Sequence, residues 1–255
     1  MYPSTLSKEQ WKLIEPFFAK TSRRGAPPKY TKEAIFNAIL YLLREGCRWR
    51  ALPHDLPPWQ IVYKHFRQWQ ARGVWAQAVA VLNIAWRQRR LGRSRRLPRH
   101  AIIDSQSVKS AAEGEEHGFH GGKKIKGRSR HIAVDSQGSL LALKVCAANH
   151  HDSQKAPETM AQAVQRYPSL EDFTGDLAYE SAANFAREQL DCDLHLARKS
   201  NTKGFTVTKF RWIVERTFAW FGQCRRLSKD YETTTTSSEA FLWIAMLRLL
   251  VRRLA

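Results

Sequence analysis

The pattern of apolar residues changes at Pro98, and this change constrains the fold more than any other feature. Before it, apolar residues recur at the three- and four-residue spacing of amphipathic helices, as in Ile35, Ile39 and Leu42. After it, short apolar runs of strand length alternate with turn residues and helical segments. The sequence therefore predicts a small all-α domain followed by an α/β domain with a mixed sheet.

Local signals mark the helices of the first part. Ser7 and Gln10 have capping-box spacing, whereas Thr31 and Gly46 are typical of the start and the end of a second helix. Six of the nine tryptophans lie here, and we expect them to pack in the core rather than stack on bases, because most fall on apolar faces. The helices are expected over residues 7–18, 31–45, 59–69 and 74–86.

The charge is distributed unevenly along the chain. Of the formal net charge of +19, residues 1–97 contribute 19 Lys and Arg against 5 Asp and Glu, whereas the remaining residues hold 23 against 18. A field of this sign attracts polyanions, with nucleic acid first and an anionic membrane surface second. The longest apolar run, residues 241–251, is too short to span a bilayer and contains Arg248. We therefore expect a DNA partner and no membrane partner.

Two segments of the first part supply candidate DNA contacts. One is the face of the third helix opposite its apolar stripe, where side chains can contact base edges and phosphates. The other, residues 87–97, is rich in arginine and is interpreted as a basic linker that follows a phosphate backbone. A solvated helix face and a flexible tether are the alternatives. The candidate contacts are Gln60, Lys64, Arg67, Gln68, Arg89, Arg90 and Arg93.

Three carboxylates occupy positions from which they can converge. Asp104 ends the apolar run that begins at Ala101, Asp176 ends a later short strand, and Glu215 lies on a helix expected over residues 210–226. Three buried like charges repel one another, and a divalent cation relieves the repulsion. Hard oxygen ligands select Mg²⁺ or Mn²⁺, and two such ions can promote in-line phosphoryl transfer.

Spacing alone leaves other acids open as members of this site, because the chain has 23 of them. For each rival we prefer a structural role, as a turn residue, a helix cap or a solvated acid. The rivals are Asp135, Asp152 and Glu180.

A glycine- and lysine-rich segment spans residues 117–131. It lacks the Gly-Lys-Ser/Thr ending of a phosphate-binding loop and does not lie between a strand and a helix, so a nucleotide site is not expected. We interpret it as a mobile basic loop that touches DNA, through Lys123, Lys124 and Lys126.

Several motifs occur along the chain in the same order as in a known protein family. They read Ile-Asp-Ser-Gln-Ser-Val-Lys from residue 103, Gly-Gly-Lys-Lys-Ile-Lys-Gly-Arg from 121, Ala-Asn-His-His-Asp-Ser from 148, Gly-Asp-Leu-Ala-Tyr-Glu from 175 and Arg-Trp-Ile-Val-Glu-Arg-Thr-Phe from 211. In this order they resemble the DDE transposases of bacterial insertion sequences, in the family founded on insertion sequence five. Residues 46–67 resemble the DNA-binding region of the same family.

The resemblance implies a ribonuclease-H-like catalytic fold in which Asp104, Asp176 and Glu215 bind Mg²⁺ or Mn²⁺. It also implies cut-and-paste movement of a DNA element through its terminal inverted repeats.

The broader class carries Tyr, Arg, Glu and Lys around the third acid, where they contact the end of the element. Arg211 matches this pattern four residues before Glu215 and is a further candidate DNA contact. Thr208 stands at the tyrosine position and Gly222 at the lysine position, so these two contacts are altered. Arg226 is a candidate substitute for the lysine.

Together these observations predict a helical, helix-turn-helix-like DNA-binding domain over residues 1–86, a basic linker over 87–97 and a ribonuclease-H-like catalytic domain over 98–255. The expected function is a transposase that binds inverted-repeat ends and target DNA. The alternatives are a nuclease of the same fold that cleaves without joining, and a DNA-binding repressor whose catalytic half is inactive.

Joining two ends in one event favours a homodimer on DNA. The start of the chain lacks the pattern of a signal peptide, and the four cysteines show no paired spacing. Both features favour the bacterial cytoplasm, in association with the nucleoid.

Overall fold

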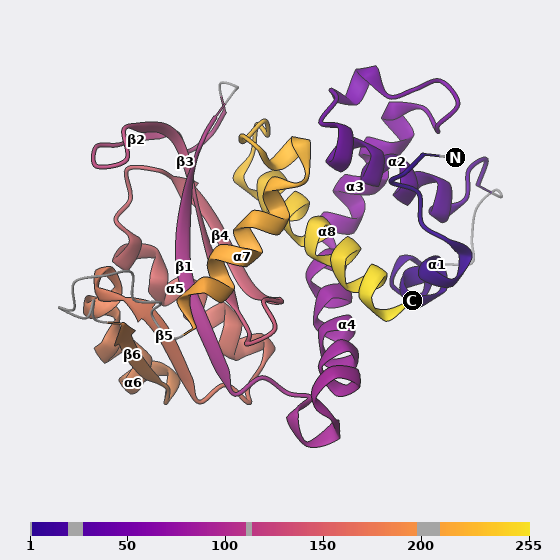
Figure 1. Cartoon of the computed structure of the whole chain (residues 1–255). Coiled ribbons are helices and arrows are strands. Elements are labelled where there is room, and N and C mark those ends of the chain that lie inside the picture. Colours follow the sequence, from indigo (N-terminus) through magenta and orange to yellow (C-terminus); the bar gives the residue numbers. More distant parts are fainter. Residues whose placement is uncertain (1, 20–27, 111–113, 198–209) are drawn as a thin grey trace.

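The computed structural model describes residues 2–19, 28–110, 114–197 and 210–255. A mixed six-stranded sheet lies on one side of the molecule and the N-terminal helices on the other, with the two C-terminal helices between them (Figure 1). Across the described ranges, no helix is both long and apolar enough to cross a bilayer.

Local sequence signals account for the N-terminal helices. The Ser7 hydroxyl accepts the Gln10 N–H at 3.2 Å, and the Gln10 side chain accepts the Ser7 N–H at 3.0 Å, so the predicted capping box is confirmed. Gly46 ends the second helix with φ +71°, a conformation that favours glycine. The elements of this region are α1 (Lys8–Ile14), η1 (Glu15–Phe18), α2 (Lys32–Glu45), η2 (Trp49–Ala51), α3 (Trp59–Ala71), α4 (Val74–Leu91) and η3 (Arg93–Arg95).

The fourth helix is longer than predicted. Residues 87–91 continue α4, so the predicted end of this helix at residue 86 is wrong. The reason is that Arg87 is 5% exposed and forms an ion pair with Asp135, at 2.8 Å between Nη1 and Oδ2. The arginine run suggested solvated side chains, because the partner carboxylate lies far along the chain.

The sheet has the arrangement of a ribonuclease-H-like fold, and the predicted fold class is confirmed. Strands β1, β3 and β4 are antiparallel neighbours, whereas β5 and β6 run parallel to β1 on its other side. The strands are β1 (His100–Lys109), β2 (Gly118–His120), β3 (Ile125–Val134), β4 (Leu140–Ala147), β5 (Asp172–Asp176) and β6 (Asp193–Ala197).

Helices cover both faces of this sheet. Ile103 points into a core shared with α5 and α6, and its neighbour Ile102 points into the opposite core with α7 and α8, as strand alternation requires. One predicted bound is wrong, because the helix expected over residues 210–226 ends at Gly222. The last helix is capped by Thr234. These elements are α5 (Asp152–Arg166), η4 (Leu177–Ala182), α6 (Ala183–Leu190), α7 (Arg211–Gly222), η5 (Arg225–Leu227) and α8 (Thr235–Leu254).

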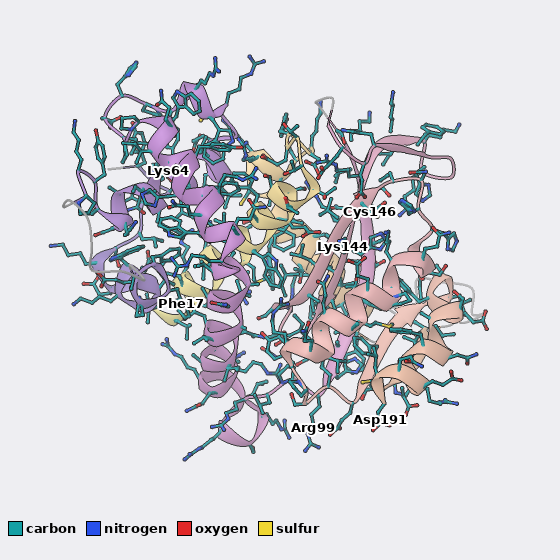
Figure 2. The ribbon with its side chains drawn as sticks, turned by 180° about the vertical axis from the view of Figure 1, so that it is seen from behind. Phe17, Lys64, Arg99, Lys144, Cys146 and Asp191 are labelled. Atoms are coloured by element: carbon teal, nitrogen blue, oxygen red, sulfur yellow. The ribbon has the colours of Figure 1, made fainter. Side chains whose placement is uncertain are left out.

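One hydrophobic core joins the N-terminal helices to the sheet through α8. This helix packs against α1, α2 and α4 as well as β4. Figure 2 shows Lys64 on the helical side and Lys144 and Cys146 on the sheet side. The division into domains 1–86 and 98–255, and the helix-turn-helix-like character of the first, stay predictions.

The glycine- and lysine-rich segment forms a hairpin rather than a loop. β2 pairs with the start of β3, so most of residues 118–131 lie in strands. Lys123, Lys124 and Lys126 are exposed, whereas Arg128 and Arg130 are buried. The basic side chains of this segment therefore divide between surface and interior, which its composition did not indicate.

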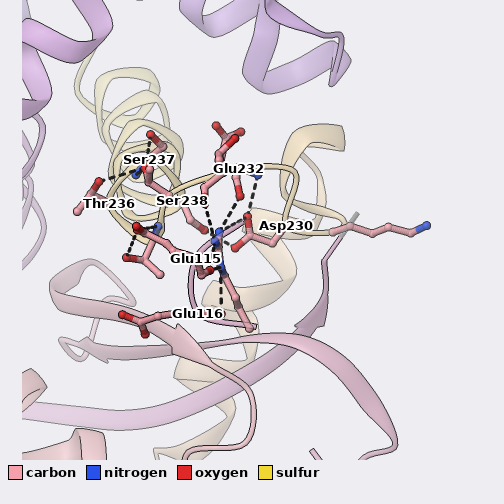
Figure 3. A network of polar contacts seen from close by, with 12 residues as sticks. Glu115, Glu116, Asp230, Glu232, Thr236, Ser237 and Ser238 are labelled. Carbon is pink, nitrogen blue, oxygen red and sulfur yellow. Dashed lines mark hydrogen bonds and ion pairs between the residues drawn. The ribbon is translucent and has the colours of Figure 1, made fainter. Parts of the chain in front are cut away.

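A buried polar network surrounds Arg128, and Figure 3 shows its partners Glu115, Asp230 and Glu232. Its guanidinium donates to the carbonyl oxygens of Glu115, Glu232 and Thr233 and to the Asp230 carboxylate at 3.3 Å. Because these partners come from the segment before β2 and from the connection between α7 and α8, the network holds the sheet against the C-terminal helices.

Candidate active site

Asp104 lies on the sheet face that α7 covers. It follows Ile102 by two residues on β1, so both side chains point to the same side. The carboxylate is half-buried, and its Oδ1 accepts the Ser105 N–H at 2.7 Å. This hydrogen bond fixes the orientation of the first predicted acid.

Asp176 ends the neighbouring parallel strand at a matching level. The last residue pair between β1 and β5 is Ile102 with Thr174, and Asp104 and Asp176 each follow two residues later. Asp176 also caps η4, because its Oδ1 accepts the Ala178 N–H at 2.9 Å. Parallel pairing therefore brings two acids that are distant in sequence to one region of one sheet face.

Glu215 lies on α7, the helix that packs against β1 and β3 on this same face. Val214 is buried beneath the helix, whereas Glu215 is exposed. Two contacts anchor α7 to the turn between β3 and β4: the Thr217 hydroxyl donates to Gly138 O at 2.9 Å and the Arg216 guanidinium to Gln137 O at 3.3 Å. The helix position is thus set by the sheet.

Arg216, the residue after Glu215, lies between two indoles. Its guanidinium carbon is 4.5 Å from the centroid of the Trp212 ring and 4.8 Å from the centroid of the Trp220 ring. Burial lowers the pKa of Arg216, and the charge of Asp135 opposes this effect. The stacked guanidinium places positive charge on the helix that carries the third acid.

The chemistry of the three acids suits a hard divalent cation, because carboxylate oxygens are the ligands that Mg²⁺ and Mn²⁺ prefer. Among the described residues, no group of three His, Cys, Asp or Glu side chains is gathered closely enough to bind a metal. Asp104 and Asp176 lie on one sheet face and Glu215 lies on the helix that packs over this face, and their use as metal ligands stays a prediction.

The rival acids have structural surroundings. Asp135 accepts the Gln137 and Ser139 N–H groups at 2.9 Å, which confirms its predicted role in a turn. Glu180 is exposed on η4. The side chain of Asp152 lies outside the described part of the chain.

A cavity of about 390 Å³ lies on the face that carries the acids. His100 and Asp172 line it, each four residues before a predicted acid on its strand, and their side chains contact each other. His195 and Phe210 complete the wall. The cavity therefore lies on the same sheet face as the acids and extends from β1 across β5 to β6.

The predicted DNA contacts of the helical region are exposed, as that role requires. All four candidates on α3 are exposed. The three arginine candidates, two on α4 and one on η3, are exposed as well. Arg89 is also held in place, because its guanidinium donates to Leu254 O at 2.7 Å. The exposed residues are Gln60, Lys64, Arg67, Gln68, Arg89, Arg90 and Arg93.

The structure describes only some of the residues that differ from the family pattern around the third acid. Gly222 is the last residue of α7, whereas Thr208 and the side chain of Arg211 lie outside the described part. Arg226 is no substitute for the lysine: it is 6% exposed, its guanidinium lies 2.7 Å from Glu232 Oε1, and it donates to Cys47 O. The prediction failed because α7 ends before this residue, so helical spacing no longer applies.

Sequence reasoning missed an aromatic cavity at the helical side. Trp49, Trp59 and Tyr63 pack against the core from its edge, and their half-buried rings also line a hollow. The sequence feature that could have revealed this cavity is the triplet of residues 48–50, in which one tryptophan stands between two arginines.

Comparison with known proteins assigns the family. A family model described as a putative transposase of the IS4/5 family matches residues 6–79, and one described as a transposase DDE domain matches residues 95–250.

Two curated relatives come from the insertion element IS402. The chain is 31% identical over 120 residues to the IS402 uncharacterized 16.2 kDa protein of Burkholderia cepacia, covering 44% of this chain and 78% of that protein. It is 26% identical over 128 residues to the putative transposase for IS402 from the same organism, covering 46% of this chain and 59% of that protein. This chain therefore spans about three fifths of that transposase.

Among solved structures, a pre-cleavage Mos1 transpososome aligns with a TM-score of 0.31 and 11% identity, covering 92% of this chain and 80% of that chain. This likeness is weak. The DDE model, in contrast, matches more than half of the chain. The chain therefore belongs to the family of transposases with a DDE domain, of the kind found in insertion sequences.

Proposed function

We propose that this chain is a transposase that binds the terminal inverted repeats of its own insertion sequence and catalyses DNA cleavage and strand transfer. The observation that carries the proposal is the pairing of β1 with β5, which brings Asp104 and Asp176 to matching levels. The helix of Glu215 packs over the same face. Membership of the DDE transposase family supports the same conclusion.

Asp104, Asp176 and Glu215 would hold Mg²⁺ or Mn²⁺. When bound, such ions supply positive charge to the attacking and leaving oxygens of a phosphoryl transfer. The chain's own contribution is orientation: backbone N–H groups fix the carboxylates of Asp104 and Asp176, and contacts to the β3–β4 turn fix α7.

Double-stranded DNA is the proposed partner, both as element ends and as target. The exposed polar side chains of α3 suit base edges and phosphates, and the exposed arginines and lysines elsewhere suit phosphates. We assign these contacts to Gln60, Lys64, Arg67, Gln68, Arg89, Arg90, Arg93, Lys123, Lys124 and Lys126, and we add Arg211 on the resemblance to the family motif alone.

Two ends must be joined in one event, so the active form is a homodimer on DNA. A DNA substrate of this kind places the protein with the bacterial nucleoid in the cytoplasm.

The test is a cleavage assay on DNA that carries the ends of the element flanking the gene, with and without Mg²⁺. Glu215→Gln keeps the size of the side chain and removes its charge, so we expect cleavage to fall below detection while binding to the ends changes less than twofold. Glu180→Gln is the matched control, because Glu180 is an exposed acid outside the proposed triad, and it retains cleavage. Normal cleavage by Glu215→Gln would remove Glu215 from the site.

A strand-transfer assay on paired ends separates this transposase from a nuclease that only cleaves. Unchanged excision by Asp104→Asn, with DNA binding retained, would favour a repressor whose catalytic half is inactive.

A further inference from the structure

A cavity of about 370 Å³ lies at the seam between the helical region and the C-terminal helices. One wall is η2 and the exposed side of α3, and the other is the segment from Tyr231 to Ser237 that leads into α8. Its size lies within the range of ordinary ligand sites. No predicted role accounts for it.

Aromatic rings line the cavity from the helical side. The Trp49 ring is held firmly, with its centroid 5.0 Å from Tyr63 at an interplanar angle of 73° and 5.2 Å from the buried Phe66. Trp59 lies at the start of α3. Tyr231 adds a fourth ring from the opposite wall and is 40% exposed. A planar ligand would therefore meet aromatic surfaces on both walls.

Three exposed cations share this wall: Arg48, Arg50 and Arg67. Within the described part of the chain, none of them forms an ion pair with an acid. The fourth arginine of the cavity, Arg226, is in contrast neutralised by Glu232. Unpaired guanidinium groups beside aromatic rings favour a ligand that joins a planar ring to an anion.

A nucleotide has this chemistry. We propose that the cavity takes an unstacked base of a DNA strand and that Arg48, Arg50 and Arg67 bind the adjoining phosphates. Arg67 also belongs to the face of α3 assigned above to DNA, so a strand bound there passes the cavity. The inference rests on the proposed function, because it takes DNA as the substrate.

The experiment uses the full chain and two probes: a blunt hairpin duplex that carries an inverted-repeat end of the element, and the same hairpin with a five-nucleotide thymidine tail that carries one 2-aminopurine. Stacking of that base on Trp59 or Tyr63 quenches its fluorescence. We expect the tailed hairpin to bind more tightly than the blunt one. Trp59→Leu should lose the quenching and weaken binding to the tailed hairpin about 5- to 100-fold, with less than twofold change for the blunt one.

Three further variants separate stacking from folding and from general charge. Trp59→Phe keeps a ring and should keep most of the quenching. Arg50→Gln changes an exposed residue and should weaken the tailed hairpin selectively. Arg72→Gln, an exposed residue at the other end of α3, is the matched control and should weaken both probes equally or not at all.

The outcomes are distinguishable. If the wild type binds neither probe, the proposed function fails as well. If it binds both equally without quenching, or if Arg50→Gln matches Arg72→Gln on both probes, only the base site is refuted. If free deoxynucleotide monophosphate competes as strongly as the tail, the cavity is a site for free nucleotides and the proposal for DNA is overturned.

Discussion

Replacing Arg87 with methionine should destabilise the protein strongly, although the residue stands in an arginine run that resembles a solvated tether. Its guanidinium forms an ion pair with Asp135 at 2.8 Å and donates to the carbonyl oxygens of Arg95, Arg96 and Leu97 at 3.1 to 3.3 Å. The ion-paired side chains are 6% and 0% exposed. Arg87 thus joins α4 to the β3–β4 turn and to the segment that enters β1.

The magnitude follows from what the substitution leaves behind. Methionine approximates the aliphatic part of the arginine, so little packing is lost, but Asp135 becomes a buried charge without its cation. Removing one partner of such a pair costs about 3–5 kcal/mol. Because the Gln137 and Ser139 N–H groups still bind Asp135, we expect a loss of about 3 kcal/mol in the free energy of unfolding.

The assay is urea unfolding, followed by tryptophan fluorescence and by circular dichroism, with linear extrapolation to water. Arg90→Met, an exposed change on the same helix, is the control and should cost less than about 0.5 kcal/mol. Adding Asp135→Asn to Arg87→Met removes the unpaired charge, so the double variant should lose less than the sum of the single losses. A loss below about 1 kcal/mol for Arg87→Met, or strict additivity, would refute this account.

Two further predictions concern salt and pH. Affinity for DNA should fall by roughly 10³- to 10⁵-fold between about 50 and 200 mM salt if 6–10 phosphates are contacted, as fluorescence anisotropy can measure; a flat response contradicts the assigned basic surface. Burial raises the pKa of Glu239 from 4.5 to about 7, although the Val145 N–H donates to its carboxylate. The folded state therefore favours the protonated form, and this contribution to stability, present below pH 4.5, is lost as pH rises toward 7. This loss of stability is on the order of 3 kcal/mol. Glu239→Gln should abolish this part of the pH dependence of the free energy of unfolding, measured by urea unfolding between pH 4.5 and 8. An unchanged pH dependence in this variant would contradict the assignment.

Features that depend on near neighbours along the chain could be predicted from the residues alone. The capping box at Ser7 and the end of α2 at Gly46 are where local pattern predicted them. The order of helices and strands also followed from periodicity and was enough to predict a helical region followed by an α/β region, whereas the ribonuclease-H-like fold was predicted from the resemblance to a family. These features need only contacts within a few residues, so short-range chemistry decides them.

The tertiary structure alone decided which charged and aromatic side chains are buried. Arginine has the same chemistry at residues 87, 89 and 226, yet two of the three are buried beside a carboxylate and one is exposed. The level at which β1 meets β5 likewise fixes where Asp104 lies relative to Asp176. Each outcome depends on a partner from a distant segment, and only folding brings that partner within range of a hydrogen bond or an ion pair.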